Sequence, residues 1–332
     1  MKILLVRFSS IGDIVLTSPV IRCVKQQTGA EVHFLTKAAF AATLRDNPYI
    51  DRLWTIHKDI SEIAPDLIAT GFTHLIDLHG NLRTLELKQR LRWGALRRRG
   101  RRPPAVTTFD KLNFRKFLLT RLRIDRMPAL HIVDRYLAAA APLGVVNDGR
   151  GLDYFIGPED RVKPPAPHYV AFVIGAAHAT KRLEEDQLFE VCRRIPSPIL
   201  LLGGPAEREL GQRIAATGAH ITNGCGAYSL NGSADLVRQA AVVVTHDTGL
   251  MHIAAAFRRP IISVWGNTVP ALGMTPYVPE DGPTAVVAEV RGLSCRPCSK
   301  IGYAHCPRGH FRCMREQDLV GIARAALLAV EA

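Results

Sequence analysis

The sequence contains no apolar run close to the ~20 residues that a membrane-spanning helix needs. Its opening, MKILLV, ends at Arg7 and lacks the apolar core and the small-residue cleavage site of a signal peptide. Gly (26) and Pro (21) are at ordinary levels, which excludes collagen-like and low-complexity chains. We therefore expect a soluble, cytoplasmic globular protein, and its 332 residues predict two domains.

Two common nucleotide-binding motifs are also missing. No G-x-G-x-x-G follows the first apolar segment, which disfavours a dinucleotide-dependent dehydrogenase. No G-x-x-x-x-G-K-[ST] is present, which disfavours a P-loop kinase.

Positive charge is concentrated in one segment. The chain has 43 Lys/Arg against 30 Asp/Glu, a net charge of +13. Residues 83–126 contain 15 Lys/Arg and three Asp/Glu, so this basic segment alone carries +12. Such a cluster indicates a polyanionic partner, although the Arg97–Arg102 run is equally compatible with a solvated loop.

Short buried strands alternate with amphipathic helices along the chain, which is typical of doubly wound parallel α/β sheets. The pattern restarts after linker-like sequence at 148–167, and this predicts two similar halves that face a cleft. We expect an N-terminal domain over 1–160 and a C-terminal domain over 161–332, with the last helix as a candidate to pack back on the first domain. The predicted strands are 2–8, 31–35, 53–56, 73–78, 169–174, 198–202, 240–245 and 260–265, and the predicted helices include 14–27, 206–216, one opening near 250, and 316–330.

One loop of the second half has the composition of a phosphate site. In Thr245-His-Asp-Thr-Gly-Leu-Met-His252 a strand, a polar turn and a helix start follow one another. A helix N-terminus attracts anions, Thr248 adds a hydroxyl, and Gly249 permits close approach, while Asp247 and His252 can face a sugar. The alternative is an ordinary capping turn, with Asp247 as N-cap and His252 as a core histidine.

Three further charged residues follow predicted strands. Lys181 can reach a diphosphate, or it is a surface lysine. Glu207 can accept from ribose hydroxyls, or it favours the dipole of the helix that it begins. Asp13, in the loop after the first strand, can take a proton from an attacking hydroxyl, or it caps the helix from Ile14 onward.

Four of the seven cysteines lie close together in the sequence, spaced C-x2-C-x7-C-x6-C. Structural zinc, packed free thiols and disulfides are the three possibilities. The loose second spacing favours packed thiols without metal. These cysteines are Cys295, Cys298, Cys306 and Cys313.

Taken together, these motifs resemble the heptosyltransferases of glycosyltransferase family nine. The resemblance covers nearly the whole chain. Its anchors are Ser9-Ser-Ile-Gly-Asp-Ile-Val-Leu-Thr-Ser-Pro19, Ile76-Asp-Leu-His-Gly-Asn-Leu-Arg83, Ala179-Thr-Lys181, Gly203-Gly-Pro-Ala-Glu207, Thr245–Ala255 and the cysteine pattern to Met314.

The resemblance implies a two-domain GT-B fold and inverting transfer of heptose from ADP-heptose to the inner core of lipopolysaccharide, on Kdo or a first heptose. It implies Asp13 as general base and no metal in catalysis, in agreement with the lack of an Asp-x-Asp loop pair. The donor would be held in the C-terminal domain by Lys181, Glu207, Asp247, Thr248, Gly249 and His252.

The N-terminal domain would bind the acceptor. We expect acceptor contacts from Ser10, Asn81, Arg83, Arg97, Arg98 and Arg99. The charge also suits an anionic inner-membrane surface, so we expect a monomeric protein on the cytoplasmic face of that membrane, with no nucleic acid and no cofactor. Two alternatives stay open: an epimerase-like nucleotide-sugar enzyme and a basic polyanion-binding protein.

Overall fold

The computed structural model describes residues 1–98 and 102–331, and their contacts group them into two compact units. The first unit contains Met1–Lys111 and Ile132–Phe155. The second contains Leu112–His131 and Ile156–Ala332. The chain therefore leaves the first unit at residue 112 and returns to it at 132 before it enters the rest of the second.

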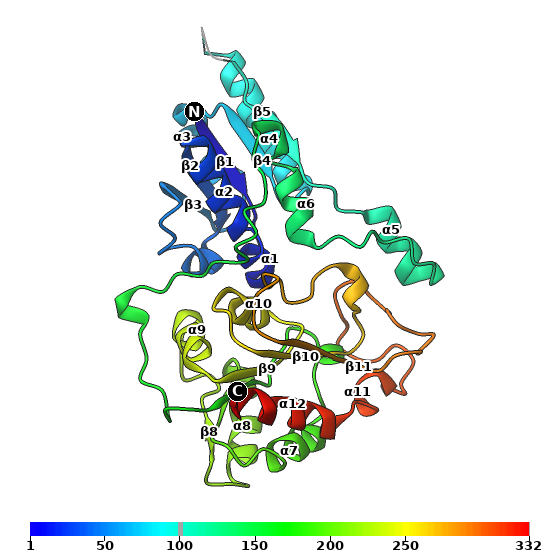
Figure 1. Cartoon of the computed structure of the whole chain (residues 1–332). Coiled ribbons are helices and arrows are strands. Elements are labelled where there is room, and N and C mark those ends of the chain that lie inside the picture. The colour runs from blue at the N-terminus through cyan, green and yellow to red at the C-terminus, as the bar shows by residue number, and fades with distance from the viewer. Residues whose placement is uncertain (99–101, 332) are drawn as a thin grey trace. The chain divides into compact units, whose positions relative to one another are not determined.

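A five-stranded parallel sheet forms the centre of the first unit, in the order β3-β2-β1-β4-β5 (Figure 1). Apolar strand residues such as Leu4 and Val6 are fully buried because helices cover both faces of the sheet. The elements are β1 (Lys2–Val6), α1 (Ile11–Val15), α2 (Ser18–Thr28), β2 (Glu31–Lys37), β3 (Arg52–Ile56), α3 (Ala64–Thr70), β4 (His74–Asp77), α4 (Leu82–Leu96), β5 (Ala105–Thr108) and α6 (Ile132–Ala138).

The first helical region differs from the single helix predicted over 14–27. It begins earlier, at Ile11, and is interrupted between Val15 and Ser18 before a second helix runs to Thr28. Pro19 stands in the first turn of α2, where its missing N–H group costs nothing. Gly29 caps the C-terminus of α2 in a left-handed conformation (φ 61°), which glycine adopts without steric cost.

The second unit is built around a six-stranded parallel sheet in the order β11-β10-β9-β6-β7-β8. The two sheets confirm the predicted α/β class with two Rossmann-like domains. The elements are α5 (Asn113–Phe117), β6 (Val170–Val173), α7 (Glu185–Arg193), β7 (Ile199–Leu202), α8 (Arg208–Ala215), β8 (Ile221–Asn223), α9 (Leu230–Gln239), β9 (Val242–His246), α10 (Gly249–Ala256), β10 (Ile261–Trp265), β11 (Ala285–Glu289), α11 (Arg312–Arg315) and α12 (Leu319–Glu331).

The last helix belongs to the core of the second unit. Helix α12 contacts α7 and strands β9 and β10, and its residues Ile322, Ala323 and Ala326 are buried in the same apolar cluster as Phe172 of β6. Within residues 1–98 and 102–331, no helix is long and apolar enough to cross a bilayer.

The basic segment 83–126 is divided between the two units. Its first part forms α4 and β5 of the first unit, and its last part, from Leu112 onward, belongs to the second. The positive charge of the segment is therefore shared between the two units.

Candidate functional site

In the first unit, the register of the strands brings two polar loops together. Val6, the last residue of β1, is aligned with Asp77, the last residue of β4. The loops that follow, 7–10 and 78–81, therefore leave the sheet at the same carboxyl edge, which is where parallel sheets bind ligands. Asp13, Ser10, His79 and Asn81 all lie on these two loops or on the helices that they open.

Asp13 is held by a dense set of donors. Its Oδ2 atom accepts from the backbone N–H (3.1 Å) and from the hydroxyl (2.8 Å) of Ser10. Its Oδ1 atom forms an ion pair with Nη2 of Arg7 at 2.7 Å. About 18% of the Asp13 side chain stays exposed.

The helix position of Asp13 differs from the predicted cap. Ser10 is the N-cap of α1, and Asp13 is the third residue of the helix, completing a capping box with Ser10. Burial alone would raise the pKa of Asp13, but the Arg7 guanidinium and the hydrogen bonds from Ser10 outweigh it and hold that pKa below its ordinary value. Asp13 is therefore ionised at neutral pH and able to accept a proton.

Arg7 is the residue that organises this half-site, and sequence reasoning missed it. It is only 9% exposed. Besides the Asp13 pair, its guanidinium donates to the carbonyl oxygens of Ser9 (2.7 Å) and Leu78 (2.7 Å), and it lies 5.8 Å from the ring centroid of Tyr136. Arg7 thus ties the loop after β1 to the loop after β4.

His79 is a second residue that the sequence did not single out as functional. Its ring contacts Phe8 edge-on, with centroids 5.3 Å apart. Burial, together with the nearby Arg7 and Lys111, lowers the pKa of His79 to about 4. The His79 imidazole is therefore neutral at pH 7. The nearby Asp13 carboxylate acts in the opposite direction, because its negative charge raises the pKa of His79. The polar loop sequence His79-Gly80-Asn81 was the available signal.

The other predicted acceptor residues fall into two groups. Asn81 caps α4 by accepting from the Thr84 N–H at 3.0 Å, and the Arg83 guanidinium lies 5.4 Å from the Phe8 ring centroid, so both are at the edge that carries Asp13. Arg97 and Arg98 follow the far end of α4, whose 15 residues span about 22 Å. Arg99 lies outside the described residues.

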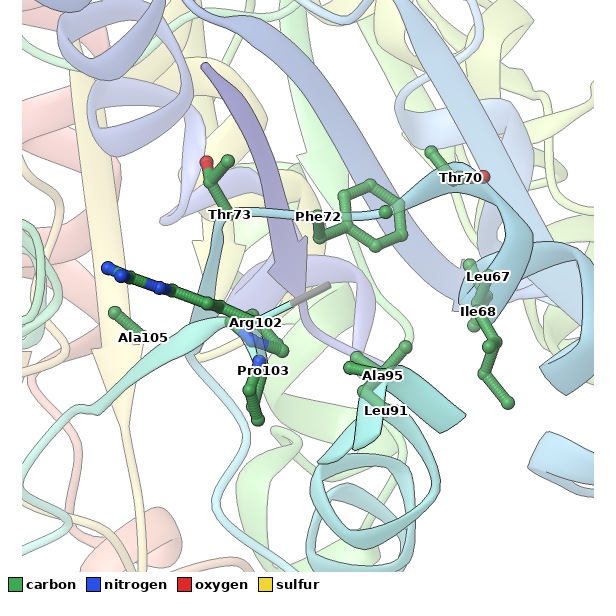
Figure 2. A pocket seen from close by; sticks show the side chains of 12 residues that line it. Leu67, Ile68, Thr70, Phe72, Thr73, Leu91, Ala95, Arg102, Pro103 and Ala105 are labelled. Carbon is green, nitrogen blue, oxygen red and sulfur yellow. The ribbon is translucent and has the colours of Figure 1, made fainter. Parts of the chain in front are cut away.

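Arg97 and Arg98 are therefore not brought to Asp13. Helix α4 begins at the carboxyl edge of the sheet and runs back toward the amino edge, where α3 ends and β5 begins. That amino edge carries its own cavity, of about 560 Å³, lined by Leu67 and Phe72, by Leu91 of α4 and by Arg102 before β5 (Figure 2). This cavity is separate from the Asp13 half-site.

In the second unit, register again aligns three strand ends. Val173 of β6 lies beside Leu202 of β7 and Thr245 of β9. The loops that follow carry Lys181, Glu207 and Asp247. In the structure, Lys181 and Asp247, 66 residues apart in the sequence, come together: Lys181 Nζ is 2.6 Å from Asp247 Oδ2.

Asp247 also contacts a residue that the sequence did not reveal. The Thr268 hydroxyl, in the loop after β10, donates to Asp247 Oδ2 at 2.9 Å. The side chains of Lys181 and Asp247 are 15% and 11% exposed. A cation, a carboxylate and a hydroxyl therefore form one partly shielded cluster at the end of the second sheet.

Thr248 is the N-cap of α10, in place of the predicted Asp247, and Gly249 is the first residue of that helix. The Thr248 hydroxyl lies 3.2 Å from the Thr245 hydroxyl and makes no capping bond of its own. The first turn of α10 therefore presents backbone N–H groups next to the Lys181–Asp247 pair. His252 follows in the same helix but is only 2% exposed, which leaves it little surface for a sugar.

Glu207 is fixed by two partners. Its Oε2 atom accepts from the Gly204 N–H at 2.9 Å, and its Oε1 atom is 3.1 Å from Nη1 of Arg182. A Cβ atom on Gly175 would come within 3.0 Å of Glu207 Oε2, so the glycine makes room for the carboxylate. Because Arg182 follows Lys181 directly, the carboxylate and the Lys181 cluster are neighbours in this half-site.

All seven cysteines are free thiols in the structure. Burial raises the pKa of Cys313 to about 12 and also raises the pKa of Cys298. Among the described residues, no three of the four clustered cysteine sulfurs lie within 4.8 Å of one another. Whether the purified protein holds metal there stays a prediction for elemental analysis.

Comparison with known proteins decides the family. The family model described as glycosyltransferase family 9 (heptosyltransferase) matches residues 104–300. The chain belongs to this family. The match begins after Asp13, so the role of that residue rests on its motif and its geometry.

Curated relatives agree with this assignment over most of the chain. Lipopolysaccharide heptosyltransferase 1 of Escherichia coli K12 is 26% identical over 297 residues, 82% of this chain and 90% of the relative. Lipopolysaccharide heptosyltransferase 1 of Pseudomonas aeruginosa is 28% identical over 303 residues, 81% of this chain and 80% of the relative. This family 9 chain is therefore similar to lipopolysaccharide heptosyltransferases over most of its length.

Solved structures confirm the GT-B fold. The family 9 glycosyltransferase from Veillonella parvula superposes with a TM-score of 0.76 at 20% identity, covering 99% of this chain and 97% of that one. The ADP-heptose lipopolysaccharide heptosyltransferase II of E. coli gives 0.71 at 17% identity, with 100% and 99% covered. A third match, at 0.63 and 22% identity over 87% and 93%, is E. coli heptosyltransferase WaaC with ADP.

Proposed function

We propose that this family 9 enzyme transfers L-glycero-D-manno-heptose from ADP-heptose, with inversion, to the inner core of lipopolysaccharide, on Kdo or a first heptose. The observation that carries the proposal is the pair of half-sites at equivalent sheet edges. One is an ionised carboxylate, Asp13, and the other a Lys181–Asp247 cluster at a helix N-terminus. The curated relatives named heptosyltransferase 1 support it.

The donor is assigned to the second unit. The diphosphate would bind at the first turn of α10, with Thr248, Gly249 and Lys181 around it. Asp247 holds Lys181 in place, and Glu207 is available to ribose hydroxyls. A solved structure of E. coli WaaC contains ADP-2-deoxy-2-fluoro heptose, which supports an ADP-sugar donor for a relative with this fold.

The acceptor is assigned to the first unit, beside Ser10, Asp13, Asn81 and Arg83. The acceptor hydroxyl oxygen attacks the anomeric carbon of the donor. The bond from that carbon to the phosphate oxygen breaks, ADP leaves with the electron pair, and Asp13 takes the hydroxyl proton. Attack opposite to the leaving group inverts the anomeric centre.

Charge stabilisation of the departing ADP is proposed to come from Lys181 and the α10 N-terminus, without a metal ion. Treatment with EDTA should then leave the rate unchanged. We further propose that the enzyme acts as a monomer at the cytoplasmic face of the inner membrane. Helix α4 separates Arg97 and Arg98 from the Asp13 half-site by about 20 Å. These two arginines would therefore contact a part of the acceptor, or of the membrane, that is distant from the reacting hydroxyl.

Binding measurements separate this proposal from an epimerase-like enzyme and from a polyanion-binding protein. Titration calorimetry with ADP, UDP and ADP-heptose should show selective binding of the adenine ligands. A fluorescent oligonucleotide should bind weakly at physiological salt. Tight, steeply salt-dependent oligonucleotide binding without affinity for ADP-heptose would contradict the proposal.

A further inference from the structure

The segment 113–124 of the second unit combines exposed aromatic side chains with positive charge. Helix α5 continues into a π-helical turn, Leu118–Leu122, so that 113–122 is one helical segment (Figure 1). Phe114 is 72% exposed and Phe117 is 51% exposed. Leu122 (55%) and Ile124 (45%) extend the same exposed apolar character past the helix. Exposed apolar side chains that gather in one segment mark a site of interaction with a protein or a membrane.

The opposite side of this helical segment is attached to the second unit. Leu119 is 6% exposed and lines a cavity together with Val269 and Pro270. The Arg123 guanidinium donates to the carbonyl oxygen of Pro297. Phe117 lies two residues before Leu119, about half a helical turn around, so anchoring Leu119 inward directs Phe117 outward. Phe114 lies three residues before Phe117, on the same face.

The positive charge of the segment favours an anionic partner. Four Lys/Arg are present between 112 and 124 and no Asp/Glu, at positions Arg115, Lys116, Arg121 and Arg123. Exposed aromatic side chains interleaved with basic residues are the combination that binds an anionic lipid interface, through apolar insertion and attraction to anionic headgroups. At 12 residues, the segment is too short to cross the bilayer.

We propose that residues 113–124 form a membrane-interfacial anchor, in which Phe114 and Phe117 insert among the lipids and Arg115, Lys116 and Arg121 contact anionic headgroups. The inference rests on the proposed function in one respect, since a lipopolysaccharide acceptor is presented at a membrane. The anchor goes beyond the proposed function because it assigns membrane attachment to a named segment of the second unit. That segment would insert apolar side chains among the lipids, in addition to the attraction between basic residues and anionic headgroups.

Co-sedimentation with vesicles tests the anchor. Full-length protein should bind vesicles of phosphatidylethanolamine and phosphatidylglycerol (7:3), bind pure phosphatidylcholine weakly, and lose affinity from low to high salt. Phe114→Ser/Phe117→Ser should weaken vesicle binding at least about tenfold, because both insertion contacts are lost. Arg115→Gln/Arg121→Gln should weaken it by about fivefold per charge.

The matched control is Val320→Ser/Leu328→Ser, which removes two exposed apolar side chains of α12, 54% and 58% exposed, outside the segment. This control should bind as the wild type does. Binding by the phenylalanine variant at wild-type strength would overturn the anchor. Failure of the wild type to bind anionic vesicles would also overturn the anchor. That result is expected if the segment binds another protein instead of lipid.

Activity on a soluble, de-acylated acceptor keeps the two proposals apart. All these variants should transfer heptose to that acceptor at the wild-type rate, because it needs no membrane. If the wild type transfers nothing to it, the proposed function fails and the vesicle result still decides the anchor. If transfer is normal and the phenylalanine variant binds vesicles normally, only the anchor fails.

Discussion

Asp13→Asn separates catalysis from folding at the first half-site. The amide keeps an oxygen that can accept the Ser10 hydrogen bonds, so the capping box is retained. What it loses is the negative charge and the ability to take a proton. A general base contributes about 10²–10⁴-fold to the rate, so we expect kcat to fall at least a hundredfold while donor affinity stays unchanged.

The structure also predicts a stability cost for this variant, because Asp13 is the ionic partner of Arg7. Breaking a fully buried pair costs about 3–5 kcal/mol. Here the Asp13 side chain is 18% exposed, and Arg7 keeps its bonds to the Ser9 and Leu78 carbonyls. We therefore expect a loss of about 1–2 kcal/mol in the free energy of unfolding.

Asp51→Asn is the matched control. Asp51 also pairs with a basic side chain, that of Lys25 at 2.6 Å, and accepts from the Val32 N–H at 2.6 Å. It precedes β3, at the amino edge of the same sheet, away from Asp13. This control should lose about 1 kcal/mol of stability, reduced by the solvent exposure of the pair, and keep wild-type kcat.

The assay is ADP release at saturating donor and acceptor, at a temperature where urea titrations show every variant to be folded. Because the pKa of Asp13 lies below its ordinary value, the group is ionised from pH 5 to 9 and its titration should not limit kcat in that range. A kcat for Asp13→Asn within threefold of the wild type would refute the catalytic role and leave only the capping box.

Three further predictions test other parts of the account. Lys181→Ala removes the cation beside Asp247, a charged hydrogen bond worth about 1.5–3 kcal/mol, so calorimetry should show ADP-heptose affinity reduced tenfold or more; wild-type affinity would refute the donor site. His79 has its pKa lowered from 6.5 to about 4, so the unfolded chain binds more protons between these values, and stability rises with pH from about 4 to 6.5. In urea titrations His79→Gln should remove about 1–2 kcal/mol of that pH dependence, because solvent around the partly exposed ring screens the effect, and an unchanged slope would contradict the burial of His79. Elemental analysis of purified protein should find no stoichiometric zinc or iron; a full equivalent would show that the clustered thiols bind metal. These thiols are Cys295, Cys298, Cys306 and Cys313.

Much of the fold could be predicted because buried parallel strands are short, apolar and bounded by loops. The strands over 31–37, 52–56 and 261–265 match prediction within two residues. Three strands were missed, β5, β8 and β11, and none has a long apolar run. β5, Ala-Val-Thr-Thr, follows an Arg- and Pro-rich stretch, and its Val106 is 45% exposed. Exposed strands lose the apolar pattern that identifies buried ones.

The candidate site was predicted only where local sequence carries the chemistry. Asp13, Lys181 and Asp247 follow strands, and the rule that ligands bind at strand ends was enough to select them. Arg7 was missed because a charged residue after an apolar run is read as the end of a strand and not as a functional residue. Its ties to the Leu78 carbonyl, 71 residues away, depend on the sheet register. Thr268 was missed for the same reason, since only packing brings it to Asp247.

Product analysis tests the central claim most directly. Purified enzyme is incubated with ADP-heptose and a lipopolysaccharide core that ends in Kdo, or in Kdo carrying one heptose, and the products are analysed by mass spectrometry and by NMR of the anomeric centre. The account predicts one added heptose, one equivalent of ADP and an anomeric configuration opposite to that of the donor. Transfer with retained configuration, or conversion of the ADP-sugar without any change in the mass of the core, would contradict it.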